Sequence, residues 1–516
     1  MTPRPDPLTR FYPESAAGGF SRNDGTVAFY QRVLALLRPD SIVIDFGAGR
    51  GQFLAHCVFC RALQSPQLPR REPADVCGQL DCRLAGVDGA LGDPTESDGF
   101  ELVGFSSQEG QKLVKLSLSN RAWATSTVCR SLWGIRPPTA NALSQALDEL
   151  VATMFDQPPR TEVSCLEISD ADGFHRYLVA MMEVDPGNTG AVRVVRAPQG
   201  VGLLVSHAIL DGAMSSVFLV QLLQRALDDP VTGRLESTQL RTRHFVSAGL
   251  GHWLRNPLGL LSSVKAVTAD LQARLRSRGT TGPVAGGPPR TVVFPVDIVP
   301  ETLDTLIAWR AAHTPEATVT TVLLAAMART LRRSGLLPEG ARCEIAVGLR
   351  RNFPALAYRW GTAVAMCPFV LRGDGPTPAQ YTERLRAFVS TGEGLFRVLL
   401  RVATDVVGTV LAGFRGGHYN AGQAALPAGH PTLAWSDLGR FDPYKAISAD
   451  CPDRTGHIAL TVTNARPGHL AFTVHRSEEG LHLTCFSDGS TSDPARFEAI
   501  VREVAADPLV YVPRDF

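Results

Sequence analysis

The sequence has little lysine and no excess of charge of either sign. Lys and Arg together number 51 against 50 Asp and Glu, which gives a formal net charge of +1. Only four of the 51 cations are lysines, a bias typical of a GC-rich genome. A protein that binds nucleic acid needs a basic surface for the phosphates, so this balance argues against nucleic acid as a partner.

Long apolar runs are also missing. No stretch approaches the roughly 18 apolar residues that a membrane-spanning helix requires. Residues 1–20 are interrupted by Arg4, Asp6 and Glu14, so they lack the apolar core of a signal peptide. Without a secretory start, the ten cysteines predict buried free thiols rather than a disulfide framework. These absences favour a soluble, cytoplasmic protein.

The length of the chain predicts more than one folded part. With 516 residues, 44% of them hydrophobic, the chain exceeds what a single core usually organises. Segments rich in Gly and Pro interrupt it at residues 64–73, 86–99 and 276–289. The predicted domains are therefore residues 1–95, 100–275 and 290–516.

Helical and strand patterns alternate after the second interruption. Apolar residues at helical spacing predict helices at 140–154, 213–227 and 318–333. Short apolar runs predict strands at 192–195, 201–205, 291–296, 343–349 and 362–371. The predicted fold class is therefore α/β (α+β), with two parts of similar size.

The strongest chemical signal is the segment Ser-His-Ala-Ile-Leu-Asp-Gly at residues 206–212. His207 leaves an apolar strand, and Asp211 and Gly212 follow at the mouth of a predicted helix. An imidazole accepts a proton from a hydroxyl or amine near neutral pH, Asp orders the local geometry, and Gly lets the backbone turn tightly. The alternative is a core histidine that pairs with an aspartate and has no catalytic role.

This H-x-x-x-D-G motif between strand and helix resembles the condensation-domain superfamily of chloramphenicol-acetyltransferase-like acyltransferases. Residues 317–350 are similar to the helix and strand of the second lobe in wax ester synthase/diacylglycerol acyltransferase relatives. Residues 435–440, Trp-Ser-Asp-Leu-Gly-Arg, stand where polyketide-associated acyltransferases carry Ser-Asn-Leu/Val-Gly. The resemblance covers residues 100–516 and implies two lobes with an active site in a tunnel between them.

The resemblance also implies a role for each motif residue. His207 would be the general base that deprotonates the acceptor as it attacks an acyl thioester, without a covalent acyl-enzyme. Asp211 would order the site through an ion pair, for which Arg350 is the candidate, and Gly212 would leave room for the pantetheine arm of the donor. Across the tunnel, near the substrate and the developing oxyanion, would lie Ser436, Asp437 and Gly439.

Several residues depart from the pattern of that superfamily. Ser206 stands where peptide-forming condensation domains carry a second histidine, which favours ester formation. Asp437 replaces the usual Asn, and an exposed turn residue is its alternative interpretation. His418 and His430 flank a Gly-rich segment and are expected to be loop residues.

The predicted function is transfer of an acyl group from a CoA or carrier-protein thioester to an alcohol in a lipid, glycolipid or other secondary metabolite. Such a reaction needs no cofactor, and its partners are the thioester donor, with an acyl carrier protein as one form of it, and the hydroxyl acceptor. An amide-forming condensation enzyme is the first alternative. A non-catalytic fusion protein is another.

The N-terminal part carries a second, incomplete resemblance. Residues 41–51, Ser-Ile-Val-Ile-Asp-Phe-Gly-Ala-Gly-Arg-Gly, place glycines at the end of a strand, where a nucleotide-like cofactor binds. The segment resembles the start of a class I S-adenosylmethionine-dependent methyltransferase. By that resemblance the cofactor-binding residues would be Asp45, Gly47, Gly49, Gly51 and Asp88. Because roughly 90 residues hold only two βα units, we expect a truncated, partial Rossmann-like remnant, with S-adenosylmethionine binding and methyl transfer as alternatives.

A group of cysteines in the same part raises the question of a metal. These residues, with one adjacent histidine, are His56, Cys57, Cys60, Cys77 and Cys82. The second pair is spaced by four residues rather than two, and the first pair falls on a predicted helix. Buried thiols are therefore the preferred interpretation, with zinc as the alternative and no metal in the prediction.

Residues 243–273 combine large apolar side chains with Arg and His. Such a segment suits a helix between the lobes that covers core, which is the interpretation we favour. The alternative is a peripheral contact with a membrane surface.

Overall fold

The structure is a computed structural model in which the chain divides into two units, Met1–Gly104 and Phe105–Phe516. It describes only residues of the second unit, namely 116–121, 123, 126–156, 158–184, 191–232, 235–277, 292–414, 432–440, 444–447, 458–462, 469–477, 480–487 and 493–512. The predicted methyltransferase-like segment, the cysteines at 57, 60, 77 and 82, His418 and His430 all lie outside the described residues.

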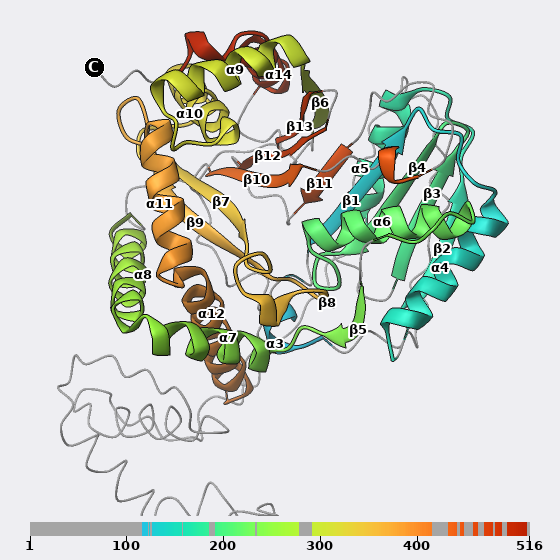
Figure 1. Cartoon of the computed structure of the whole chain (residues 1–516), viewed down its shortest axis with the longest axis horizontal. Helices are drawn as coiled ribbons and strands as arrows, with labels where there is room; N and C mark the ends of the chain where they lie inside the picture. The colour runs from blue at the N-terminus through green and yellow to red at the C-terminus, as the bar shows by residue number, and fades with distance from the viewer. Residues whose placement is uncertain are drawn as a thin grey trace, which may run out of the picture. The chain divides into compact units, whose positions relative to one another are not determined.

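The first lobe is built on a mixed sheet. Its strands, in spatial order, are β11 (Ile458–Val462), β1 (Thr127–Trp133), β4 (Gly200–Ser206), β3 (Ala191–Ala197) and β2 (Arg160–Cys165). Only the β2–β3 pairing in this sheet is parallel. One core contains side chains of α4 (Ala140–Met154) and α6 (Gly212–Ala226), and the other contains side chains of α5 (Ala171–Val184). The helices therefore cover both faces of the sheet, as Figure 1 shows.

Burial on both faces explains the sequence of the central strands. Every residue of β1 and β4 is buried, and such strands read as nearly continuous apolar runs. A charged side chain inside a run of this kind needs several hydrogen bonds, because its desolvation is costly. Arg130 in β1 is such a residue and is fully buried.

The second lobe is built on a larger mixed sheet. Its strands, in spatial order, are β6 (Val292–Ile298), β13 (Leu481–Ser487), β12 (His469–Arg476), β10 (Thr432–Arg440), β7 (Arg342–Gly348) and β9 (Val364–Val370). Its helices are α7 (Thr242–Arg255), α8 (Pro257–Ser277), α9 (Pro300–His313), α10 (Val319–Arg333), α11 (Pro378–Ser390), α12 (Glu393–Phe414) and α14 (Pro494–Ala506). Side chains of sheet and helices form one continuous core.

Short elements and one strand connect the two lobes. β11 follows the β10 strand of the second lobe in the chain but pairs with β1 of the first lobe (Figure 1). The short elements are α3 (Leu118–Arg121), β5 (Glu236–Gln239), β8 (Arg359–Trp360), η2 (Pro354–Leu356) and η3 (Tyr444–Ala446); another short element, η4 (Pro508–Val510), follows α14 in the second lobe. Because β5 pairs with β8, and Trp360 and Ile447 belong to the first-lobe core, the lobes exchange segments. The domain boundaries drawn from the sequence stay a prediction.

The predicted α/β class is confirmed, and the local elements lie close to their predicted positions. The predicted helix at 140–154 is α4, with Thr139 as its N-cap. The predicted helix at 318–333 begins one residue later, because the side chain of Thr318 caps it. The runs at 192–195 and 201–205 form the antiparallel pair β3 and β4.

Two expectations about the whole chain can be compared with the described residues. Cys129, Cys343, Cys367 and Cys485 are free and buried, as predicted, whereas Cys165 is free and exposed. Among the described helices, none combines the length and the apolar character that a membrane span requires.

Candidate active site

His207 lies in the turn that joins β4 to α6. Its backbone N–H donates to the carbonyl of Ser126 at 2.8 Å, next to the start of β1. Ser206 Oγ accepts from the amide of Ala208 and so belongs to the turn. The side chain of His207 is buried. The turn therefore holds this imidazole in place instead of leaving it free at the surface.

A residue of the second lobe fixes the tautomer of the imidazole. The hydroxyl of Thr362 donates its only hydrogen to the carbonyl oxygen of His207, and it lies 3.0 Å from Nδ1 of the same residue. Because this hydrogen is already used, Thr362 Oγ1 must accept from Nδ1–H. The tautomer assigned by this network carries the lone pair on Nε2. Nε2 makes no hydrogen bond within the part of the chain that the structure describes.

An aromatic ring covers one face of the same imidazole. Trp123 stacks on His207 with ring centroids 4.5 Å apart and an interplanar angle of 17°. The guanidinium of Arg401, from α12, lies 5.4 Å from the centre of the Trp123 ring. Burial lowers the pKa of His207 to about 4; Asp211 opposes this shift, and Arg130 and Arg401 add to it. The imidazole is therefore neutral at physiological pH and able to accept a proton.

Asp211 connects the turn to the second lobe. Its Oδ1 accepts from the amide of Met214 at 3.0 Å and so caps α6. Its Oδ2 accepts from Nε of Arg350 and from the amide of Ala363, each at 3.0 Å. Burial would raise the pKa of Asp211, but Arg350 and the two amides lower it on balance. The carboxylate is thus a charged structural link, which is the role that the resemblance implies.

Arg350 is the expected partner, and it binds more than the carboxylate. Its guanidinium also donates to the carbonyls of Leu356, Arg359 and Gly361. Gly361 in turn donates to the carbonyl of Ile209 at 2.7 Å. The segment 350–361 is therefore tied to the motif through both side-chain and backbone hydrogen bonds.

Gly361 is required at its position for two reasons. Its φ of +116° is one that residues with a Cβ rarely adopt. A Cβ there would come within 2.5 Å of the side-chain nitrogen of Asn120. Asn120 is buried and accepts from the amide of Thr362 at 3.2 Å. Asn120 and Gly361 together position the threonine that orients His207.

Arg130 supports the start of α6. It donates to the carbonyls of Gly212 and Cys129 and to Ser216 Oγ. Burial lowers the pKa of Arg130 to about 10, so it is still charged at neutral pH. A buried cation beside the motif also helps to keep the imidazole of His207 neutral.

The Trp-Ser-Asp-Leu-Gly-Arg segment lies against the motif through its leucine. A Cβ added to Gly212 would meet Arg130 Nη2 at 3.0 Å and Leu438 Cδ2 at 3.1 Å. Ser436 is two residues before Leu438 in β10, and the pairing of β10 with β12 is regular up to Asp437. The space beside Gly212 is thus narrow, and its lining includes a residue of the second lobe.

Asp437 has the turn role that was its alternative interpretation. Its Oδ1 accepts from the amide of Gly439, and its Oδ2 accepts from the hydroxyl of Thr320 at 2.7 Å. Gly439 has a φ of +77° at the irregular end of β10. Contact of Ser436, Asp437 or Gly439 with substrate stays a prediction.

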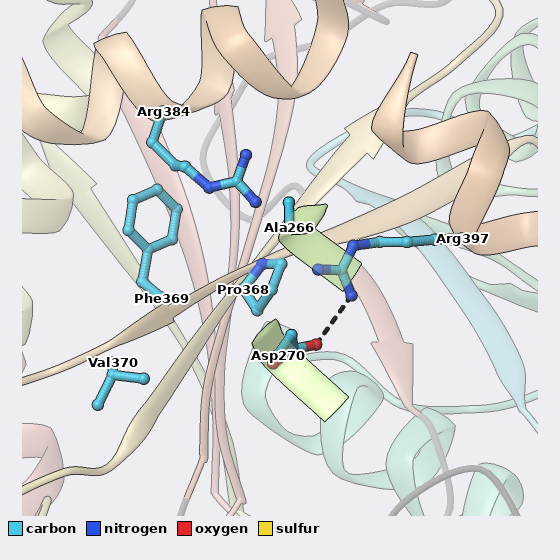
Figure 2. A pocket seen from close by; sticks show the side chains of 7 residues that line it. All are labelled: Ala266, Asp270, Pro368, Phe369, Val370, Arg384 and Arg397. Atoms are coloured by element: carbon cyan, nitrogen blue, oxygen red, sulfur yellow. Dashed lines mark hydrogen bonds and ion pairs between the residues drawn. The ribbon is translucent and has the colours of Figure 1, made fainter. Parts of the chain in front are cut away.

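A separate hollow lies in the second lobe and is distinct from the His207 site. Its volume is about 240 Å³, and its lining residues, drawn in Figure 2, are Ala266, Asp270, Pro368, Phe369, Val370, Arg384 and Arg397. Asp270 pairs with Arg397 and with Arg342, and the buried Glu393 pairs with Arg384 and Arg397. The charged groups of this hollow are therefore arranged as ion pairs between carboxylates and guanidiniums.

Sequence reasoning found the motif and Arg350 but missed the residues that orient the histidine. Thr362, Asn120 and Trp123 have no local signature, because each is distant from His207 in the chain. Arg130 did leave a signal, since it is a lone charge inside an apolar strand. The signal indicates a buried cation, and its location beside Gly212 becomes known only from the structure.

The comparisons with known proteins give similarity of fold only. No protein-family model matches the chain, and no curated protein matches it. The first condensation domain of the calcium-dependent antibiotic synthetase is 16% identical, with a TM-score of 0.49, over 77% of this chain and 97% of that one.

Two further solved structures give similar values. Polyketide synthase associated protein 5 from Mycobacterium tuberculosis is 14% identical (TM-score 0.46; 77% of this chain and 98% of that one). The condensation enzyme VibH is 13% identical, with a TM-score of 0.44, over 74% of this chain and 91% of that one. At such identities the activity has to be inferred from the residues of the site.

Proposed function

We propose that this protein transfers an acyl group from a CoA or carrier-protein thioester to a hydroxyl acceptor, with His207 as general base. The observation that carries the proposal is the state of the imidazole, which is neutral, held through Nδ1 by Thr362, and without a hydrogen bond at Nε2 among the described residues. A core histidine with a purely structural role would be expected to use both ring nitrogens.

The reaction follows from the free lone pair. Nε2 of His207 takes the proton from the acceptor hydroxyl while the hydroxyl oxygen forms a bond to the thioester carbonyl carbon. The tetrahedral intermediate then collapses, the carbon–sulfur bond breaks, and the imidazolium gives its proton to the leaving thiolate. The products are an ester and a free thiol, and the histidine returns to its neutral form. Because both substrates are held next to one imidazole, their proximity provides a large part of the rate enhancement over the uncatalysed reaction.

Other residues are assigned supporting roles in this proposal. Asp211 and Arg350 keep the motif turn attached to the second lobe, Gly212 lets the donor arm approach, and Ser436 is a candidate donor to the oxyanion. One well-placed oxyanion donor contributes about 3 kcal/mol to transition-state stabilisation. No cofactor enters the reaction, and an acyl carrier protein is one candidate source of the thioester.

The test is release of free thiol from acyl-CoAs in the presence of mixed alcohols. We expect release that depends on the acceptor and that falls by roughly 10²–10⁴-fold in His207→Ala. His313→Ala, an exposed histidine on α9, is the matched control and should keep the wild-type rate. Equal release by wild type and His207→Ala would remove the histidine as base. If acyl-CoAs are inert, the same panel loaded on a carrier protein must show the effect, and inert carrier thioesters would reject the proposal.

Amide formation is the competing reaction at the same base. Mass spectrometry of products from paired hydroxyl and amine acceptors separates the two reactions. We expect the ester, because Ser206 replaces the second histidine of peptide-forming domains. An amide as the main product would keep His207 as base and replace the predicted acceptor class.

A further inference from the structure

Helices α7 and α8 expose an unusual line of large apolar side chains. One side of α7 is buried through Phe245 and Trp253. The other side, continued into α8, exposes Val246, Leu250, Leu254, Leu258 and Leu261, to 40%, 49%, 83%, 72% and 66%. We call these five residues the leucine stripe. They follow each other at intervals of four, four, four and three residues, so within each helix they share a face.

The stripe lies at an outer corner of the second lobe. Figure 1 shows α7 and α8 meeting at an outer corner of the second lobe, where Asn256 separates the two helices. Leu254 and Leu258, the most exposed members, flank that corner. Contiguous exposed apolar side chains of this kind usually mark an interaction site.

Within α7 and the first half of α8, the charged side chains are all of one sign. Between residues 241 and 269 there is no Asp or Glu. The cationic residues in this span are Arg241, Arg243, Arg255 and Lys265, and all are exposed. Arg243 precedes the first stripe residue by three positions, and Lys265 follows the last by four, so a basic residue continues the stripe at each end. Burial, together with Arg359, Arg243 and Arg241, lowers the pKa of His244 in the same helix, as expected where positive charge is dense.

We infer that this corner binds the surface of an anionic phospholipid bilayer. The leucines would enter the boundary between headgroups and acyl chains, and the basic residues would contact lipid phosphates. Apolar side chains on one face with flanking Lys and Arg are the features of helices that lie at membrane interfaces. The opposite face of the same helices packs on the second-lobe core. The two interpretations of residues 243–273, a helix that covers the core and a contact with a membrane, therefore apply to different faces of one segment.

Vesicle flotation of the full chain tests the inference. We expect the protein to float with phosphatidylcholine vesicles that contain phosphatidylglycerol and to float far less with phosphatidylcholine alone. The double variant Leu254→Ser/Leu258→Ser should reduce the bound fraction about tenfold. Val510→Ser, which removes an apolar side chain that is 65% exposed in η4, is the matched control and should bind like wild type. Because all three positions are exposed, the circular dichroism and melting temperature of these variants should match wild type.

Three results would overturn the inference. They are absence of flotation with anionic vesicles, equal flotation by the double variant, and a lipid-free wild-type dimer that the double variant converts to monomer. The last result would assign the stripe to contact between copies of this chain. Thiol release with water-soluble acceptors is measured on the same variants. It should be unchanged, so failure of the membrane contact is distinguishable from failure of the proposed activity.

Discussion

At the scale of single residues, the proposed function depends on the state of His207. Its imidazole is buried and stacked on Trp123, and its Nδ1 is held by Thr362. Burial disfavours the protonated form, and the fixed Nδ1–H leaves the lone pair on Nε2. The two effects act together, because a base must be both unprotonated and correctly oriented.

The first prediction concerns pH. In the proposed reaction the active form is the neutral imidazole, and burial lowers the pKa of His207 from 6.5 to about 4. Thiol-release activity should therefore persist as the pH falls through 6.5 and should be lost only as it approaches the lowered pKa. The measurement is kcat/KM against pH, with circular dichroism at each point to confirm that the protein is folded. An acid limb centred near the ordinary histidine pKa would contradict the buried, neutral state.

The second prediction concerns Thr362 as a positioning residue. Thr362→Val preserves shape but removes the hydroxyl, so the ring is free to adopt the other tautomer. We expect kcat to fall about tenfold with KM nearly unchanged. Thr362→Ser keeps the hydroxyl and should restore most of the rate. If the valine and serine variants have equal kcat, the hydroxyl does not orient the base.

At the scale of elements, the turn between β4 and α6 is held from the opposite lobe. Asp211 caps α6 and also accepts from Arg350, which itself binds three backbone carbonyls. Both partners of this ion pair are largely buried, with side-chain exposures of 2% and 12%. Removing one partner of such a pair leaves a charge without compensation.

We therefore predict a large effect of Arg350→Ala. The free energy of unfolding should decrease by about 3–5 kcal/mol, measured by denaturant titration. Arg351→Ala, the exposed neighbour, is the control and should change it by no more than about 0.5 kcal/mol. If the two variants unfold at similar denaturant concentrations, the link between Asp211 and Arg350 adds no stability.

At the scale of the whole molecule, the two lobes share parts. β11 completes the first sheet although it lies in the chain between strands of the second sheet. Trp360 and Ile447 enter the first-lobe core from segments that lie in the chain between elements of the second lobe. Neither lobe can therefore open fully without disturbing the other.

This exchange predicts shared opening in hydrogen exchange. Peptides from β1 in the first sheet and β12 in the second should exchange with the same free energy of opening, because both depend on global unfolding. In Arg350→Ala both free energies should decrease together. Markedly different values for the two strands in the wild type would mean that the lobes open independently.

Local signals in the sequence were sufficient for several elements and for the motif. Helix α4 was predicted from the spacing of its apolar residues, and the structure adds Thr139 as its N-cap. The H-x-x-x-D-G segment was recognisable because its residues are close together in the chain, whereas Arg350 was selected through the family resemblance. The predicted boundary near residue 290 could not account for β11. This strand lies beyond the boundary in the chain but pairs with the first sheet, and no local pattern in the sequence indicates that pairing.

The sequence by itself therefore determined the α/β class, several of the helices and strands, and the motif that contains His207 and Asp211. Only the tertiary structure decided which way the base faces and which apolar residues stay exposed. Thr362 and His207 are 155 residues apart, and Arg350 and Asp211 are 139 apart. Periodicity and capping act over a few residues, whereas the approach of such distant groups depends on how the lobes pack. The leucine stripe is a further example. Its spacing in the sequence is that of a helix face buried in a core, and only the packing of the helices determines that these side chains are exposed to solvent.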